Sequence, residues 1–163
     1  EFNYTHLINL SKNISFIWRN KDKETSIKNL IELRDFCKKN QRCFYISNDV
    51  KLAQKMNADG VYISSTNKNL NLKTTNLKKN FRIIGSAHNL KEIKIKELQN
   101  TEEIFLSPLF KKKTNKQLNI FRYLKLRATT KMNDISLGGI NNKNLKKLNM
   151  IKPFGFAGIS YFE

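Results

Sequence analysis

The chain has 163 residues, 39% of them hydrophobic, which fits an ordered globular protein rather than a disordered chain. No run of about 18 apolar residues occurs, so no transmembrane helix is predicted, and the first residues lack a signal-peptide pattern, which favours a cytoplasmic protein. The formal net charge is +18, but Lys and Arg are dispersed rather than interleaved with aromatic residues, which argues against nucleic acid as the main ligand.

Short apolar segments alternate with amphipathic segments along the chain. The segments predicted as strands are 14–18, 43–46, 60–63, 81–85, 103–106, 136–137 and 156–159. The segments predicted as helices are 25–39, 50–56, 90–98 and 141–150, with residues 5–10 as the end of a further helix. Because helix-length spacers between short buried strands require crossover connections, the sheet is predicted to be parallel. Cys37 and Cys43 lack metal or redox spacing and are predicted to be buried thiols.

Polar or glycine residues follow nearly every predicted strand. A doubly wound open sheet could hold these strands, but polar residues at the strand ends favour a (β/α)8 barrel of the TIM type, whose active site lies at that edge. Such a barrel normally needs about 200 residues or more. We therefore expect residues 1–163 to form one barrel domain that lacks its first strand and last helix. Strand edges left open in this way are prone to association, and a homo-oligomer could cover them.

Two glycine segments near the end of the sequence are candidate phosphate sites. Gly138 and Gly139 follow an apolar segment and precede a predicted helix, and Gly158 to Ser160 follow the next predicted strand. Glycine lets a ligand approach the backbone amides closely, and amides beside a helix N-terminus attract anions. In eight-fold barrels the loops after strands seven and eight commonly bind phosphate. A plain turn is the alternative interpretation of the Gly-Gly pair.

Charged and amide side chains follow the first two predicted strands. Arg19 and Lys21 are suited to phosphate contacts, although a solvated loop is the alternative in a chain so rich in lysine. Asn48 and Asp49 lie between a predicted strand and a predicted helix. Asp49 could cap that helix, or it could bind Mg²⁺ while Asn48 donates to a phosphate.

Ser86 and His88 follow the strand predicted over 81–85. A single histidine can be purely structural, but imidazole ordinarily titrates near neutral pH, so His88 is a candidate acid/base group. The sequence shows no Ser-His-Asp order, nucleotide-binding loop or zinc-ligand spacing.

Several segments together resemble the thiamine-phosphate synthase and TenI superfamily. They are Trp18–Lys21, Ile46–Asp49, Ala58–Tyr62, Gly85–His88, Ser107–Phe110, Leu137–Asn141 and Gly158–Ser160. Each motif is generic, but their order and spacing from about Ser15 to Tyr161 are more specific. The resemblance implies a (β/α)8 barrel that joins hydroxymethylpyrimidine pyrophosphate to a thiazole phosphate and releases pyrophosphate.

The resemblance also assigns roles to individual residues, and these roles imply small phosphorylated substrates. Pyrophosphate would be bound by Arg19, Lys21, Asn48 and, in the loop after Phe110, Thr114. Mg²⁺ would be bound by Asp49, and Ser86 would assist the leaving group. The thiazole phosphate would be bound by Gly138, Gly139, Gly158, Ile159 and Ser160.

The chain departs from the synthase pattern at Ile17, Asn20, Tyr62, Asn67 and residues 111–115. Asn67 stands where a second Mg²⁺-binding Asp is expected, so metal affinity should fall. These departures resemble TenI-like members, some of which isomerise a thiazole carboxylate phosphate with a histidine at the position of His88. The synthase is the first expectation. A TenI-like tautomerase and a non-catalytic phosphate-binding barrel are the alternatives.

Overall fold

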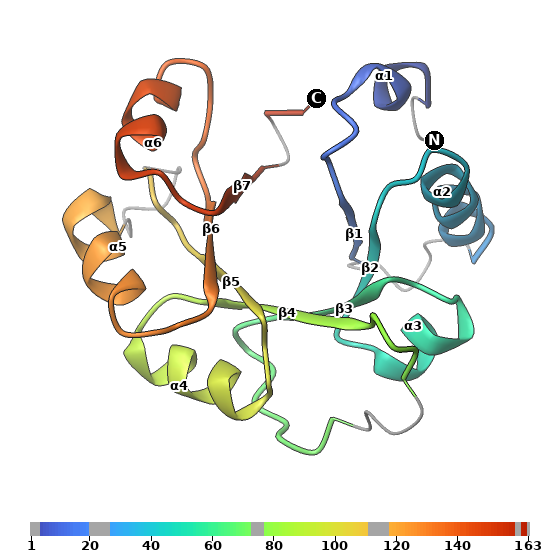
Figure 1. Ribbon diagram of the computed structural model, residues 1–163, viewed down its shortest axis with the longest axis horizontal. Coiled ribbons are helices and arrows are strands. Elements are labelled where there is room, and N and C mark those ends of the chain that lie inside the picture. The colour runs from blue at the N-terminus through green and yellow to red at the C-terminus, as the bar shows by residue number, and fades with distance from the viewer. Residues whose placement is uncertain (1–3, 20–26, 73–76, 111–117, 159–160, 163) are drawn as a thin grey trace. The chain divides into compact units, whose positions relative to one another are not determined.

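The computed structural model describes residues 4–19, 27–72, 77–110, 118–158 and 161–162. Within these ranges the chain forms six helices and seven strands that alternate almost throughout, as the apolar pattern predicts (Figure 1). Two compact units contain these elements: residues 1–62 with 72–82, and residues 63–71 with 83–163.

In the first unit, three strands pair in parallel and in chain order. They are β1 (Phe16–Trp18), β2 (Phe44–Ser47) and β3 (Gly60–Ile63), accompanied by helices α1 (Tyr4–Asn9), α2 (Ile27–Lys39) and α3 (Val50–Lys55). Trp18 is in register with Ile46, and Ser47 with Tyr62, so the carboxyl ends of the strands meet at one edge. Helices α2 and α3 lie on the outer side of these strands (Figure 1).

Helix α2 packs its apolar side on this small sheet. Leu30, Leu33, Phe36 and Cys37 are its buried residues, and they recur at the spacing of one helical face. The Phe36 ring meets the Phe16 ring of β1 edge-on, with 6.0 Å between the ring centroids. The helix predicted over residues 25–39 is therefore confirmed for the part that the structure describes.

The two cysteines of the first unit differ in exposure, and one prediction about them is wrong. Cys37 is buried, and burial raises the pKa of its thiol to about 12. Cys43 was predicted to be buried as well, but it is exposed. The reason is that β2 begins at Phe44, so Cys43 lies just outside the buried strand rather than within it.

In the second unit, four strands pair in parallel, again in chain order. They are β4 (Arg82–Ala87), β5 (Glu103–Leu106), β6 (Asn133–Leu137) and β7 (Gly155–Ala157), accompanied by α4 (Leu90–Leu98), α5 (Asn119–Arg127) and α6 (Leu145–Ile151). The helices cover the outer side of the strands (Figure 1). Parallel pairing in chain order is the pattern that a β/α barrel requires. The complete eight-fold barrel remains a prediction.

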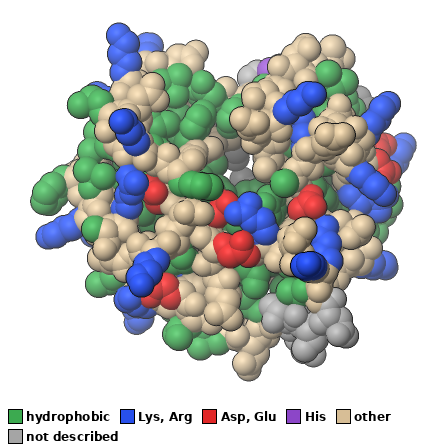
Figure 2. Space-filling model, viewed as in Figure 1, with side chains coloured by type: hydrophobic (Ala, Val, Ile, Leu, Met, Phe, Trp, Pro, Cys, Tyr) green, Lys and Arg blue, Asp and Glu red, His purple; other side chains and the backbone are tan. Residues whose placement is uncertain are grey.

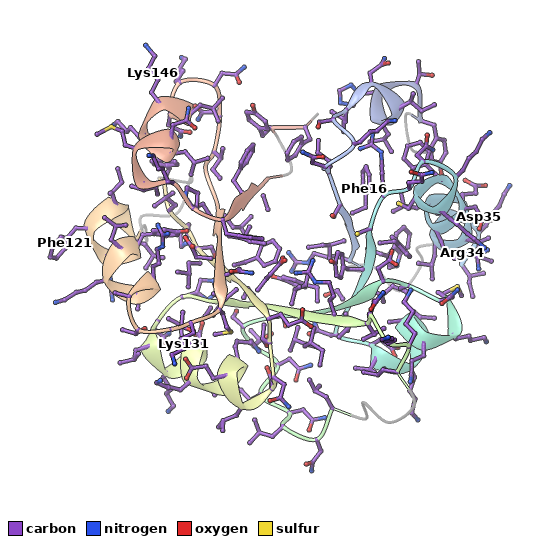
Figure 3. All side chains as sticks on the ribbon, in the orientation of Figure 1. Phe16, Arg34, Asp35, Phe121, Lys131 and Lys146 are labelled. Atoms are coloured by element: carbon purple, nitrogen blue, oxygen red, sulfur yellow. The ribbon has the colours of Figure 1, made fainter. Side chains whose placement is uncertain are left out.

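The sequence analysis did not predict helix α5, which carries an important part of this core. Tyr123 on α5 is fully buried, and its hydroxyl donates to Asp134 Oδ2 at 2.6 Å and accepts from Ser136 Oγ at 2.8 Å. Burial and the adjacent Asp134 carboxylate raise the pKa of Tyr123. Phe121, 74% exposed, points away from the core (Figure 3). An outward aromatic residue of this kind obscures the helical pattern of apolar residues.

On the face shown in Figure 2, the positively charged side chains are scattered. Lys and Arg side chains spread over the visible face and alternate with acidic and neutral groups (Figure 2). Among the helices of the described ranges, none has the length and apolar character needed to cross a membrane.

Candidate functional site

In the first unit, predicted site residues lie at the carboxyl ends of β1 and β2. Arg19 directly follows Trp18, and Asn48 and Asp49 directly follow β2. Because Trp18 is in register with Ile46, these residues leave the same edge of the sheet. The structure thus places Arg19, Asn48 and Asp49 at one edge, as the sequence predicts.

Asp49 is the N-cap of α3. Its backbone is extended, and its Oδ1 atom accepts a hydrogen bond from the Leu52 N–H at 2.9 Å. The capping interpretation is therefore confirmed. The residue is exposed, and among the described residues no group donates to its Oδ2 atom. The cap leaves that oxygen accessible to a ligand.

Asn48 and Arg19 both contact Tyr62, which lies near the end of β3. Asn48 has a φ of 61°, a left-handed conformation that asparagine tolerates better than most residues. Its N–H donates to the Tyr62 carbonyl at 2.8 Å. The Arg19 guanidinium carbon lies 5.8 Å from the centroid of the Tyr62 ring, within the range of a cation–π contact. Tyr62 therefore helps to position the groups proposed to hold an anion.

The side chains at this edge provide some of the oxygen ligands that Mg²⁺ requires. In the described part of the chain, no three His, Cys, Asp or Glu side chains are arranged to hold a metal ion. Mg²⁺, however, is usually bound through one or two carboxylates together with waters and substrate phosphates. Asp49 supplies one carboxylate with an uncommitted oxygen, so the residues fit this mode of binding and not an all-protein cage.

In the second unit, Ser86 lies inside β4 and is buried. Its Oγ accepts a hydrogen bond from the Ser65 N–H at 3.0 Å. Ser65 belongs to the segment that follows β3, so Ser86 fixes the backbone of a neighbouring loop. The structure thus gives Ser86 a hydrogen-bond partner that the sequence did not indicate.

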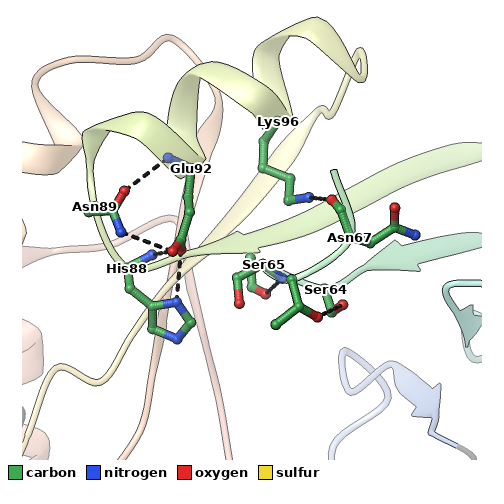
Figure 4. A network of polar contacts seen from close by, with 9 residues as sticks. Ser64, Ser65, Asn67, His88, Asn89, Glu92 and Lys96 are labelled. Carbon is green, nitrogen blue, oxygen red and sulfur yellow. Dashed lines mark hydrogen bonds and ion pairs between the residues drawn. The ribbon is translucent and has the colours of Figure 1, made fainter. Parts of the chain in front are cut away.

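His88 forms a close pair with Glu92 at the start of α4 (Figure 4). Glu92 Oε2 lies 2.9 Å from His88 Nδ1 and accepts from the His88 backbone N–H at 2.7 Å. Asn89, the N-cap, accepts from the Glu92 N–H at 3.0 Å and donates to Glu92 Oε1 at 2.9 Å. This reciprocal arrangement resembles a capping box, except that the Glu92 carboxylate accepts from the backbone N–H of His88, the residue before the N-cap, and also engages the histidine ring.

The pair determines which ring nitrogen carries the proton. Partial burial alone would raise the pKa of Glu92, but the hydrogen bonds from the His88 side chain and backbone outweigh it and hold the pKa below its usual value. The ionised carboxylate can only accept, so Nδ1 of His88 must donate to it. In the neutral ring, Nε2 is then a hydrogen-bond acceptor, as a general base requires.

The Gly-Gly turn lies where β6 ends, beside the end of β7. Leu137 is in register with Ala157, so the backbone leaves both strands at neighbouring positions, at Gly138 and Gly158. Gly138 and Gly139 have φ values of 99° and 71°, which non-glycine residues rarely adopt. The two glycine segments therefore begin side by side, as predicted.

The helix expected directly after the glycine pair begins later than predicted. It was predicted to start at Asn141 but starts at Leu145 as α6. Asn141 N–H donates to Asn144 Oδ1 at 3.0 Å, and Asn144 Nδ2 donates to the Gly139 carbonyl at 2.7 Å. These side-chain bonds compete with helix formation. The glycine amides therefore lie outside the first turn of α6, and the helix-terminus argument does not apply to them.

Four predicted site residues fall outside the described ranges: Lys21, Thr114, Ile159 and Ser160. Their proposed roles stay predictions.

Sequence reasoning missed Glu92 and the fully buried Lys96 on α4. The Asn89-x-x-Glu92 spacing resembles a capping box and could have revealed Glu92. Nothing in the sequence distinguishes Lys96 from the many exposed lysines.

Both units place polar groups at the carboxyl ends of parallel strands, the edge at which β/α proteins bind their ligands. The family model described as thiamine monophosphate synthase matches residues 10–162. The chain belongs to this family, and the family resemblance expected from the sequence is confirmed.

Individual relatives agree with this assignment. The chain is 32% identical to the thiamine-phosphate synthase of Pelagibacter ubique, over 94% of this chain and 77% of the relative. It is 30% identical to a thiamine-phosphate synthase of Prochlorococcus marinus, over 72% of this chain but only 35% of that relative. The fold is similar to the solved structure of thiamine phosphate pyrophosphorylase from Pyrococcus furiosus, with a TM-score of 0.75, 19% identity, and coverage of 96% of this chain and 77% of that chain.

Proposed function

We propose that this chain is a thiamine-phosphate synthase, acting in thiamine biosynthesis. In the proposed reaction, the bond between the pyrimidine methylene carbon and a pyrophosphate oxygen breaks. The ring nitrogen of the thiazole phosphate forms a bond to that carbon, and pyrophosphate leaves. The observation that carries the proposal is the family match over residues 10–162, joined to an Asp49 carboxylate that keeps one oxygen accessible at the end of β2.

The first unit is proposed to hold the leaving group. The Arg19 guanidinium and the Asn48 amide are suited to bind pyrophosphate oxygens. The family resemblance gives the same role to Lys21 and Thr114, which lie outside the described ranges. Asp49 would hold Mg²⁺. When bound, the ion supplies positive charge that stabilises the departing pyrophosphate.

The family resemblance gives further roles to residues of the second unit. Ser86 is proposed to assist departure by hydrogen bonding. Gly138, Gly139 and Gly158, with Ile159 and Ser160, are proposed to bind the thiazole phosphate through backbone amides. The adjacent ends of β6 and β7 support this role because they bring the two glycine segments together.

Incubation with both substrates and Mg²⁺, followed by an assay for thiamine phosphate, tests the proposal. We expect product that depends on both substrates and disappears when a chelator removes Mg²⁺. Activity that survives chelation would show the Asp49–Mg²⁺ mechanism to be wrong. Failure to form product under any condition would overturn the synthase function.

The His88–Glu92 pair favours a second candidate, a TenI-like thiazole tautomerase. A tautomerase moves a proton between ring positions, a step that needs a group able to accept and return it. The carboxylate of Glu92 orients the His88 ring with Nε2 available for that step. This activity should need no Mg²⁺. If neither substrate set reacts but a thiazole phosphate binds, the chain is a non-catalytic phosphate-binding protein.

A further inference from the structure

Lys96 of α4 is completely buried, which is rare for lysine. Its Nζ atom donates to the Asn67 carbonyl at 2.9 Å (Figure 4) and to Gln99 Oε1 at 2.6 Å. Asn67 lies in the segment that follows β3, whereas Lys96 and Gln99 lie one turn apart at the end of α4. The lysine therefore reaches from the helix to a loop almost thirty positions earlier in the sequence.

Gln99 also binds the loop that contains Asn67. It is 2% exposed, and its Nε2 donates to the Asn67 carbonyl at 3.1 Å and to the Asn69 carbonyl at 2.8 Å. These bonds orient the amide so that Oε1 faces Lys96. Two buried side chains, one on α4 and one at its C-cap, thus hold two backbone carbonyls of the same loop.

The strand beneath makes room for the lysine. A Cβ added at Gly85 of β4 would lie 2.8 Å from Lys96 Cδ, so the aliphatic stem passes directly over this glycine. The next residue is Ser86, whose Oγ accepts from the Ser65 N–H. The loop held by Lys96 is therefore the loop that contacts Ser86.

We infer that Lys96 is a positioning residue: with Gln99 it fixes residues 64–69 so that the Ser65 N–H stays hydrogen-bonded to the Ser86 hydroxyl. This bond occupies one lone pair of Ser86 and directs its proton elsewhere, which suits donation to a leaving group. The catalytic part of the inference rests on the proposed function of Ser86. The structural part, control of the loop, does not.

The charge of Lys96 matters to this role. Burial lowers the pKa of Lys96 to about 8, although the negative charge of Glu92 on the same helix opposes this shift. The two groups that accept from Lys96 Nζ, the Asn67 carbonyl and the Gln99 side-chain amide, carry no charge. Below about pH 8 the ammonium therefore makes charge-assisted bonds, and above it the neutral amine makes weaker ones.

Amide hydrogen exchange of the folded protein tests loop control independently of any activity. K96M removes the donors but keeps a stem of similar length, and K94M removes a charge from an exposed position of the same helix. In K96M we expect exchange of the Ser65 amide to accelerate by roughly 10-fold to 10²-fold, the value of a hydrogen bond to a charged group. K94M should leave it unchanged. Equal Ser65 exchange in the two variants would overturn the inference.

Two further measurements complete the test. If K96M does not fold, Q99M, which keeps the Lys96–Asn67 bond, should accelerate Ser65 exchange by a smaller factor. No acceleration in Q99M would then overturn the inference. In an active enzyme, kcat should fall above about pH 8 in the unmodified chain, and K96M should lose this limb of the pH profile. A limb retained in K96M would refute the catalytic part alone, and an inactive chain would leave the exchange test intact.

Discussion

The β2–α3 and β4–α4 junctions are built alike but use their carboxylates differently. In both, a buried strand ends, a polar turn follows, and an Asx residue caps a helix. Within the described part of the chain, the Asp49 carboxylate accepts one hydrogen bond, from the Leu52 N–H, and the residue is exposed. Glu92 accepts three, from the His88 backbone, the His88 ring and the Asn89 amide.

The difference separates two uses of a negative charge at a helix N-terminus. A carboxylate with an uncommitted oxygen can bind an ion or a ligand, because binding does not cost it an existing bond. A carboxylate whose oxygens are all engaged instead orients the groups that donate to it. We therefore expect Asp49 to act on ligands and Glu92 to act on His88.

D49N is expected to have the largest effect. Asparagine caps helices about as well as aspartate, so stability should hardly change. The charge that would hold Mg²⁺ is lost, however, and metal stabilisation of this kind contributes several kcal/mol, or roughly 10²-fold to 10⁴-fold in rate. Synthase assays and urea unfolding of the same preparation measure both effects. Full synthase activity in D49N would show that Asp49 serves only as a cap.

H88A should affect synthase activity less than D49N does, and should have a large effect only on tautomerase activity. A general acid or base contributes about 10²-fold to 10⁴-fold, so a tautomerase should lose that factor while a synthase loses much less. E92Q leaves the ring in place but removes the carboxylate that orients it. It should therefore reproduce part of the H88A loss, with a changed ring tautomer detectable by ¹⁵N NMR. An unchanged tautomer in E92Q would contradict the positioning role of Glu92.

Lowering the pH should remove the contribution of the Glu92 carboxylate to the free energy of unfolding. Because the pKa of Glu92 is lowered in the folded protein, its stabilising contribution is present above the usual glutamate pKa and is lost as pH falls through the folded value. The difference in unfolding free energy between the unmodified chain and E92Q should therefore shrink from about pH 6 to about pH 3. Chemical unfolding across this range measures it. A difference that stays constant with pH would argue against an ionised Glu92 as the source.

Several features of these junctions could be predicted from the sequence. Short apolar segments bounded by amphipathic ones predicted β2, α3, β4 and α4, because both patterns reflect burial of one side. The order of motifs predicted the family, which the match over residues 10–162 confirms. Asp49 was placed correctly at a strand end, since only Asn48 and Asp49 separate β2 from α3.

Other features depend on contacts between distant residues and left no pattern to detect. In a chain with 31 Lys and Arg residues, burial of Lys96 depends on space above Gly85 and on the Asn67 carbonyl, neither of which the sequence near Lys96 reveals. The late start of α6 depends on asparagine side chains that bond within the loop. The repeated asparagines are visible in the sequence, but only these specific side-chain bonds determine that residues 141–144 form a loop rather than the first turn of the helix.

The smallest expected effect is the loss of stability when either N-cap, Asp49 or Asn89, is replaced by alanine. Replacing an N-cap by alanine costs about 1 kcal/mol, because one backbone N–H loses its partner. D49A should show about this loss relative to D49N. N89A should lose more, because Asn89 both accepts from the Glu92 N–H and donates to Glu92 Oε1. Urea unfolding of D49A, D49N and N89A at neutral pH measures the difference. If N89A were no more destabilising than D49A, the bond from Asn89 to the Glu92 carboxylate would contribute nothing, and only the two bonds from His88 would distinguish Glu92 from Asp49.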